Sequence, residues 1–471
     1  MNIDTINNNI IKLFNSEQAW FFKVIPYELI NDSVKILCFS SQMPNQDELE
    51  VLLNKTVIFE KVEEKQLIEL LNKYYRIKVD KTNILSTNIN KISTDFFEQL
   101  LEESISLGAS DIHLEPSEKW AKVRFRIDGK LIERNTLDLY KYAELINRIK
   151  IKSNLDISEK RLPQDGRILT EVNSIKLDLR ISIIPSLNGE KIVLRLLGTN
   201  AEHLDLNKLG FTTTNLESYL IGTKKNNGII LISGPTGSGK TTTLYATLKM
   251  LNKPDVNIMT IEDPVEYTLN GITQVQVKES IGLTFAASLR SFLRQDPDII
   301  MIGEIRDKET AELAIRASLT GHLVLSTIHT NSAWGTINRL KDMGIAPFLI
   351  SDTLNTSVAQ RLIRTLCPVC KQRILENDLD IQIRNYFNKD DKLQLYKPVG
   401  CEQCYYTGYY GRKAIYEVIN VDHTIKSLIK QDDTSGNVNA ATFNTLQDNA
   451  LAMFKDGITS WEEVYTILIS K

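Results

Sequence analysis

The stretch GPTGSGKT, residues 234–241, constrains the fold of this 471-residue chain more than any other. It satisfies the pattern G-x-x-x-x-G-K-[ST] and lies between the apolar run NNGIILIS and the helix-forming run TTTLYATLKML. Glycines in such a loop turn backbone N–H groups toward a β-phosphate, and the following helix adds its positive dipole end. The sequence therefore predicts a strand, a phosphate-binding loop and a helix, with the nucleotide held by Gly234, Pro235, Thr236, Gly237, Ser238, Gly239, Lys240, Thr241 and Thr242.

Two residues of this loop have distinct expected roles. Lys240 is placed to reach the β- and γ-phosphates of ATP, and Thr241 offers a hydroxyl to Mg²⁺. Further apolar runs, VNIMTIEDP, DIIMIGE and GHLVLSTIH, alternate with the helical runs FAASLRSFLRQ and KETAELAIRASL. Strands separated by helices predict a parallel sheet that binds ligands at the carboxyl ends of its strands.

Acidic residues follow two of these predicted strands. TIEDPVEY offers Glu262, Asp263 and Glu266, and DIIMIGE ends in Glu304, where Gly303 occupies the position expected for a metal-binding Asp. A triphosphate site needs an acid for Mg²⁺ and a residue that orients or deprotonates the attacking water. Glu262 and Glu304 are the candidates, and the residues alone leave their roles interchangeable.

The fourth predicted strand contributes two histidines. His329 lies at its carboxyl end, a position suited to sensing the γ-phosphate. His322 lies seven residues earlier, so the two rings are expected on opposite faces of the strand and not on one metal. We expect His322 to be structural.

Length and composition bound the class of protein. A chain of 471 residues predicts three or four domains, and 42% hydrophobic residues indicate a globular protein. The formal charge of −3 and the pI near 6.1 provide no basic field for nucleic acid. No run approaches the roughly 18 apolar residues of a membrane span. We expect a cytoplasmic protein without a transmembrane segment, docked peripherally on a membrane.

The region upstream of the phosphate loop predicts a separate α+β domain. Residues 1–80 mix helical and strand-like runs, and residues 81–92 resemble a linker. Asp95 and Glu98 form an expected capping box at the start of a helix. In KVRFRIDGKLIER, apolar residues alternate with arginines up to Asp128–Gly129, which predicts a two-residue hairpin turn.

Two later strands of this domain, within residues 93–205, carry arginines. Alternation places Arg180 on a polar face, whereas Arg195 shares its face with Val193 and Leu197, where an apolar residue would cost less. An arginine in that setting requires an anion. The residue pattern alone favours a salt bridge within the domain.

Four of the five cysteines form two C-x-x-C pairs, Cys367 with Cys370 and Cys401 with Cys404. Two such pairs predict a closed, tetrahedral Zn²⁺ site of structural type. The segment between the pairs has no basic or aromatic stripe that would favour nucleic-acid binding. Cys38 lies in an apolar run and is expected to be a buried small residue.

The combined motifs resemble the secretion ATPases that drive type II secretion and type IV pilus assembly, the GspE/PilB family. The resemblance covers residues 93–471 and is carried by GPTGSGKTTTLY, TIEDPVEY, LRSFLRQDPDIIMIGEIRD, TGHLVLSTIHTN, SDIHLEP, RFRIDG, RLPQDGR, NGEKIVLRLL and QRLIRTLCPVCK. It implies an α/β fold: a RecA-like P-loop ATPase core at 206–365, preceded by an α+β, PAS-like domain of N2 type at 93–205. A tetracysteine zinc insert at 366–412 and a helical C-terminal subdomain at 413–471 complete it, with residues 1–80 as a docking domain.

The resemblance also implies residue roles. It assigns Glu304 to Mg²⁺ through the water shell and Glu262 to the attacking water. It makes Arg180 and Arg195 cationic fingers on the γ-phosphate, which reverses the preference for a salt bridge at Arg195. The implied protein is a homohexameric motor that uses ATP and Mg²⁺ and contains Zn²⁺. It would act at the cytoplasmic face of the inner membrane through a platform protein and a membrane-associated docking protein.

Two rival functions follow from the same motifs. A nucleic-acid translocase or helicase would use the same phosphate loop, although the acidic pI argues against it. The second rival is a nucleotide-gated scaffold that binds ATP without useful turnover. This hypothesis follows from Gly303, which stands where a metal-binding Asp is expected. The four-cysteine insert favours the assembly or secretion branch over retraction ATPases.

Overall fold

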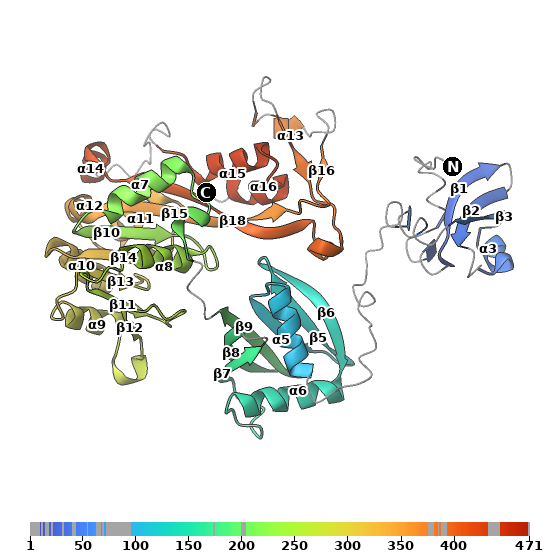
Figure 1. The fold of residues 1–471 in the computed structure, drawn as a ribbon, viewed down its shortest axis with the longest axis horizontal. Coiled ribbons are helices and arrows are strands. Elements are labelled where there is room, and N and C mark those ends of the chain that lie inside the picture. The colour runs from blue at the N-terminus through green and yellow to red at the C-terminus, as the bar shows by residue number, and fades with distance from the viewer. Residues whose placement is uncertain are drawn as a thin grey trace.

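The structure is a computed structural model (Figure 1), and it describes residues 10, 13–14, 18–19, 22–30, 33–39, 44–53, 55–62, 67, 70–71, 96–172, 175–198, 204–374, 381–384, 386–387, 393–431 and 443–469. The expected cap at Asp95 lies outside these residues. Among the described helices, none combines the length and apolarity needed to cross a membrane.

The N-terminal region contains a three-stranded sheet. β1 (Ile25–Ile30) pairs antiparallel with β2 (Ser33–Phe39), and β2 pairs in parallel with β3 (Thr56–Val62). The helix α3 (Gln46–Leu53) connects the parallel pair. Cys38 is fully buried in this region, as expected from its apolar neighbours.

The six-stranded domain, residues 96–198, is an antiparallel sheet in the order β6-β5-β4-β9-β8-β7. Two amphipathic helices supply buried residues to its core at i, i+3, i+4 and i+7 spacing, for example Phe97, Leu100, Leu101 and Ser104 in the first. The elements are α5 (Phe96–Ser106), β4 (Asp111–Pro116), β5 (Trp120–Ile127), β6 (Lys130–Asp138), α6 (Leu139–Lys152), β7 (Gln164–Val172), β8 (Ile175–Ser186) and β9 (Gly189–Gly198).

The predicted hairpin of this domain is present between β5 and β6. Val123, Phe125 and Ile127 are buried, in agreement with the alternation of the sequence. Asp128 and Gly129 both have positive φ, +48° and +82°, which is the conformation that a two-residue I′ turn requires.

The ATPase core is built on a seven-stranded sheet in the order β12-β11-β13-β14-β10-β15-β18, parallel except for the last strand (Figure 1). All strands and helices predicted around the phosphate loop are present. The strands are β10 (Gly228–Ser233), β11 (Ile258–Glu262), β12 (Thr273–Gln276), β13 (Ile299–Ile302), β14 (Leu323–Ile328), β15 (Leu354–Leu366) and β18 (Tyr409–Asn420).

Helices cover both faces of this sheet. On one face pack α7 (Thr213–Thr223) and α8 (Lys240–Leu251), the helix that follows the phosphate loop. The other face carries α9 (Phe285–Phe292), α10 (Lys308–Leu319), α11 (Ala333–Asp342), α12 (Pro347–Thr353), α14 (His423–Lys430), α15 (Leu446–Lys455) and α16 (Trp461–Leu468).

The four-cysteine module, residues 366–408, lies between β15 and β18. It contains the two-stranded sheet of β16 (Gln372–Arg373) and β17 (Tyr396–Lys397), with α13 (Ile381–Arg384) and the turn η5 (Glu402–Cys404). Because β18 pairs with β15, the boundary proposed between residues 412 and 413 falls inside a strand of the core sheet.

The S-x-x-E pattern of Ser460 and Glu463 predicts a capping box, and this expectation is wrong. Ser460 is the N-cap residue of α16, but its side chain bonds to the Tyr409 hydroxyl at 2.7 Å and makes no capping bond. Glu463 instead accepts hydrogen bonds from Arg364. The capping box of this region lies in α15, between Thr445 and Asp448.

Candidate nucleotide site and metal centre

The phosphate loop connects the buried end of β10 to the first turn of α8. Gly239 is the N-cap residue in the left-handed conformation, with φ of +88°. A Cβ on Gly234 would lie 2.5 Å from the backbone carbonyl oxygen of Gln360. A Cβ on Gly239 would lie 2.8 Å from the side-chain Nε2 of Gln360. The glycines therefore let the loop pack closely against β15.

Lys240 begins α8 and is largely buried. Its Nζ donates to the carbonyl oxygens of Gly234 at 2.8 Å and Pro235 at 3.1 Å. Burial lowers the pKa of Lys240, and the nearby Glu304 carboxylate acts in the opposite direction. Ser238 Oγ is buried without a hydrogen-bond partner among the described residues, so the loop holds a hydroxyl that a phosphate oxygen would satisfy.

Gly303 directly follows β13 and lies in a narrow space. Its amide donates to the Ile261 carbonyl at 2.8 Å, and an added Cβ would lie 3.3 Å from both that oxygen and the Glu262 Cα. An Asp at this position would press on β11. Close strand packing therefore explains why the acid of this strand is displaced by one residue to Glu304.

Glu304 lies at the centre of a charged group beside the loop. One carboxylate oxygen accepts from Arg306, and the other lies 3.4 Å from His329 Nε2. Hydrogen bonding to Glu304 raises the pKa of Arg306. The structure thus brings together three of the expected site residues, Lys240, Glu304 and His329.

Glu262 has different surroundings from those expected of a residue that activates water. It is 3% exposed, and its carboxylate accepts from Thr260 at 2.6 Å, from Gln274 at 3.2 Å and from the Tyr245 hydroxyl. Burial raises the pKa of Glu262 despite these hydrogen bonds. The acid is held in the interior, between β11 and α8.

Glu266, four residues further on, faces the six-stranded domain. Arg180 Nη2 lies 3.8 Å from Glu266 Oε2 and donates to the Val265 carbonyl oxygen at 2.8 Å. Glu266 Oε2 is buried and has no hydrogen-bond partner among the described residues. The sequence pointed to Glu266 as one of three acids, but nothing in it distinguished this acid from Glu262.

Arg195 lies opposite Arg180 in the register of β8 and β9, on the same face of the sheet. Its Nε donates to Asp111 Oδ1 at 3.0 Å, and its side chain is 59% exposed. Ile192 and Leu194 are the buried apolar residues described in β9 and alternate with the exposed Arg195, so the expectation that Arg195 lies on an apolar face is wrong. In this conformation Arg180 reaches the core and Arg195 is paired within its own domain.

His322 contacts the end of α10. Its Nδ1 lies 2.8 Å from the Ala317 carbonyl oxygen and 3.2 Å from the Thr320 hydroxyl. This is the structural position expected from its place at the start of β14.

The two C-x-x-C pairs converge on one point. All four Sγ atoms lie within 4.8 Å of one another, with separations of 3.8 Å for Cys367–Cys401, 3.7 Å for Cys370–Cys404 and 3.8 Å for Cys401–Cys404. A tetrahedron of sulfurs at ~2.3 Å from a Zn²⁺ ion has edges of about 3.8 Å. Backbone amides of Gly400 and Gly408 donate to the sulfurs, which favours thiolates. The cluster is compatible with zinc.

The site combines a phosphate loop, placed between a parallel strand and a helix, with an acid, a lysine and a histidine at the same sheet edge. These features define a P-loop ATPase with a RecA-like core. A sequence profile described as "Type II/IV secretion system protein" matches residues 87–466. The chain belongs to this family.

Individual relatives agree with this assignment. The Type II secretion system ATPase E of Vibrio cholerae serotype O1 is 47% identical over 373 residues, which cover 78% of this chain and 74% of that protein. The Type IV pilus assembly ATPase PilB of Myxococcus xanthus is 41% identical over 490 residues, with 98% and 86% covered. The solved structure of the Legionella pneumophila ATPase DotB shares the fold, with a TM-score of 0.63 at 20% identity over 83% of this chain and 100% of that chain. The expected fold class and the expected class of enzyme, a secretion or pilus assembly ATPase, are confirmed.

Proposed function

We propose that this chain is a motor that hydrolyses ATP at residues 234–242 and uses the six-stranded domain as its moving part. The observation that supports the proposal is the contact of Arg180 with the Val265–Glu266 loop, because it joins a cation of a separate domain to the loop that follows β11. A motor needs this type of link, since hydrolysis must change the position of one domain against another.

The loop residues bind the triphosphate. Lys240 binds the β- and γ-phosphates, and the exposed Thr241 hydroxyl is a ligand of Mg²⁺. Glu304 holds the water shell of this ion, which neutralises charge on the phosphates. His329, beside Glu304, senses the γ-phosphate.

Glu266 takes the role that the family resemblance gave to Glu262. Glu262 has its carboxylate engaged by three donors in the interior, whereas Glu266 presents an unsatisfied oxygen toward an arginine. A residue that orients water needs a free lone pair at the site. Glu262 then acts as a support that fixes Tyr245 of α8.

Arg180 is the finger already near the core, and Arg195 is the second. Arg195 stands next to Arg180 in the cross-strand register, so a rotation of the six-stranded domain moves both together. Its bond to Asp111 holds the guanidinium until the domain closes.

The cysteine cluster holds a structural Zn²⁺ ion. Four sulfur ligands leave no open coordination position for chemistry. The ion closes the four-cysteine module and joins the adjoining ends of β15 and β18.

The assembled machine is a homohexamer at the cytoplasmic face of the inner membrane. Relatives named as secretion and pilus assembly ATPases support this placement. Residues 1–80 dock on a membrane-associated protein, and the motion is passed to an inner-membrane platform protein. Nucleic acid is not a partner, because the arginines along the open face of the six-stranded sheet are paired with Asp178, Glu266 and Asp111.

Phosphate release by the assembled protein tests the proposal. Lys240→Ala lowers turnover by roughly 10²-fold or more, since removal of one preorganised charge donor costs about that factor. Glu304→Gln lowers turnover similarly and leaves nucleotide binding intact. The matched control is Lys253→Ala, an exposed lysine just after α8, which retains full activity. Undiminished turnover in Lys240→Ala refutes the proposed site, and absence of turnover in the wild-type ring favours the scaffold function.

A further inference from the structure

A buried arginine lies directly behind the phosphate loop, on β15. Arg361 is 8% exposed, and its Nη1 donates to the Gln360 carbonyl oxygen at 3.1 Å. The same nitrogen would lie 3.2 Å from a Cβ on Gly234, so the guanidinium packs against the first residue of the loop. Arg361 also contributes to the lowered pKa of Lys240.

The other end of this guanidinium holds the loop that carries His329. Arg361 Nη2 donates to the Asn331 backbone oxygen at 3.0 Å and to its Oδ1 at 3.3 Å. Asn331 lies two residues after His329, which contacts Glu304. The planar guanidinium of Arg361 holds its donors in a fixed arrangement, and it therefore fixes the position of the bound loop in a way that a lysine cannot. Arg361 therefore ties the histidine loop to β15 by hydrogen bonds, and its guanidinium packs against Gly234 of the phosphate loop.

A buried acid on the neighbouring strand, Glu417, acts on Arg361 through its charge, without a direct ion pair between the two side chains. Glu417 of β18 pairs in register with Ala359, which places it diagonally across from Arg361 on the same face of the sheet. Burial lowers the pKa of Arg361, and the Glu417 charge opposes this shift. Burial likewise raises the pKa of Glu417, with Arg361 among the groups that oppose it. Each charge stabilises the other in the interior.

Glu417 in turn joins two helices. One carboxylate oxygen accepts from the Ala333 amide at 2.7 Å, at the start of α11, and the other accepts from the Leu446 amide at 3.2 Å, at the start of α15. The first amides of a helix have no partner within the helix and favour an anion. The helix α11 directly follows the histidine loop, whereas α15 belongs to the C-terminal region.

We propose that Arg361 is a positioning residue for ATP hydrolysis, and that the Arg361–Glu417 pair transmits the nucleotide state from the histidine loop to the N-terminus of α15. The inference rests on the proposed hydrolysis at residues 234–242. It adds an output path inside the core to the motion of the six-stranded domain.

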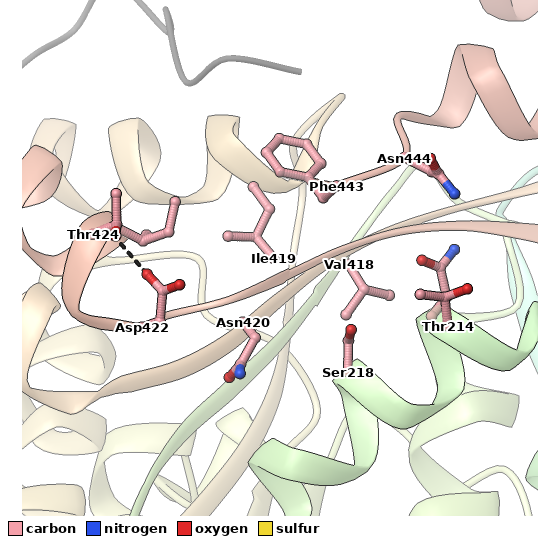
Figure 2. Close-up of a pocket in the computed structure, with 11 residues that line it drawn as sticks. Thr214, Ser218, Val418, Ile419, Asn420, Asp422, Thr424, Phe443 and Asn444 are labelled. Atoms are coloured by element: carbon pink, nitrogen blue, oxygen red, sulfur yellow. Dashed lines mark hydrogen bonds between the residues drawn. The ribbon is translucent and has the colours of Figure 1, made fainter. Parts of the chain in front are cut away.

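The start of α15 has space in which to respond. A cavity of about 300 Å³ lies between α7, the end of β18 and the segment that leads into α15 (Figure 2). Phe443 and Asn444 of that segment line the cavity, opposite Thr214 and Ser218 of α7 (Figure 2). The residues two and three positions before Leu446 therefore border open space, whereas Leu446 itself is packed in the core.

The kinetic test compares Arg361→Gln with Arg364→Gln in the full-length ring. Arg364 lies three residues further along β15, is partly buried, and pairs with Glu463 of α16. Arg361→Gln lowers kcat by roughly 10- to 100-fold, since misplacement of a catalytic loop by ~1 Å costs about that much. KM for ATP changes by less than about threefold, because Lys240 and its loop remain. Arg361→Lys restores only part of kcat.

Hydrogen exchange tests the transmission. In the wild type and in Arg364→Gln, Mg²⁺ with a non-hydrolysable ATP analogue changes the protection of the first amides of α15. In Arg361→Gln this nucleotide-dependent change disappears, while exchange of the phosphate loop still responds. If Arg361→Gln does not fold, Arg361→Lys takes its place, with a reduced change expected.

Two results overturn the inference. One is an unchanged kcat in Arg361→Gln. The other is a nucleotide-dependent change in the protection of the first amides of α15 that is as large in Arg361→Gln as in the wild type. Loss of turnover in the wild type itself would instead refute the proposed function, so the two failures are distinguishable.

Discussion

Two acids four residues apart, one at the end of β11 and one in the loop after it, show how local packing decides the role of a residue. Glu262 is the last residue of the buried strand, so its side chain enters the layer between the sheet and α8, where Tyr245 and Thr260 bind it. Glu266 lies past the strand, where its backbone amide donates to the Tyr245 hydroxyl and its carboxylate is directed toward Arg180. One tyrosine thus positions both acids. We expect only Glu266 to act on the attacking water.

Substitution by glutamine separates the two acids. Glu266→Gln lowers kcat by roughly 10²- to 10⁴-fold, the usual contribution of a positioned acid or base, and leaves the folded state intact. Glu262→Gln destabilises the protein by about 1–3 kcal/mol, because an amide group cannot accept all three hydrogen bonds. Steady-state phosphate release and thermal unfolding measure both effects. A stable Glu262→Gln variant without turnover would reverse the assignment.

The pH dependence of the stability difference between the wild type and Glu262→Gln tests the raised pKa of Glu262. Because burial raises the pKa of Glu262, folding takes up a proton there. The stabilisation is fully present below the unfolded pKa and is lost as pH rises through the higher folded pKa. The wild type therefore exceeds Glu262→Gln in Tm by more at pH ~5 than at pH ~8. An equal difference at both values would contradict a raised pKa.

At the scale of elements, the sequence predicts segments whose signals are local. The run GIILIS followed by GPTGSGKT specifies β10 and α8 because apolar residues, glycines and the helix start agree. The hairpin at Asp128–Gly129 is specified in the same way. Each local preference matches the final structure, which makes these predictions reliable.

Other elements depend on distant partners and were not predictable. β15 contains buried polar residues such as Asn355, Gln360 and Arg361, which no alternation rule assigns to a central strand. They are tolerated because groups remote in sequence satisfy them, as Thr243 does for Gln360 at 2.9 Å. A remote partner also explains why the expected cap at Ser460 is absent, because its hydroxyl bonds to Tyr409 of β18 instead of to a helix amide.

The cysteine cluster joins the far ends of β15 and β18. Cys367 directly follows β15, and its amide donates to the Gly408 carbonyl at 3.0 Å, one residue before β18. Among its described residues the module has few buried apolar side chains, and one of them, Leu395, packs in the core of the seven-stranded sheet. We therefore expect metal binding by the four sulfurs to supply much of its stability.

Cys401→Ser tests this structural role. The wild type is expected to contain one zinc ion per chain by elemental analysis, and the variant loses it. Tm falls by about 2–4 °C for each kcal/mol of lost stability, and protease cleavage within residues 366–408 increases. The matched control, Cys38→Ser, keeps its zinc because Cys38 is buried in the N-terminal region. Retention of stoichiometric zinc by Cys401→Ser would rule out the four-sulfur site.

At the scale of the whole molecule, few polar contacts between described residues join the six-stranded domain to the rest. Arg180 meets the loop after β11, and the Asp128 turn receives the Gly411 amide at 2.8 Å, with Arg412 3.7 Å away. A cavity of about 360 Å³ remains between the hairpin and the four-cysteine module. An interface of this type is suited to repeated docking and release rather than to permanent attachment.

Substitutions at Asp128 separate the turn from the contact. Asp128→Gly preserves the positive φ of the turn but removes the acceptor for Gly411, whereas Asp128→Asn preserves both and loses only the charge. A contact worth ~1–2 kcal/mol shifts the equilibrium by roughly 5- to 30-fold toward the undocked domain. Single-molecule energy transfer between dyes at the exposed Tyr140 and Phe348 reports this population. We expect a broad, long-distance population in Asp128→Gly and a distribution near that of the wild type in Asp128→Asn. Identical distributions in Asp128→Gly and the wild type would mean that the turn does not hold the domain, and that Arg180 alone links it to the core.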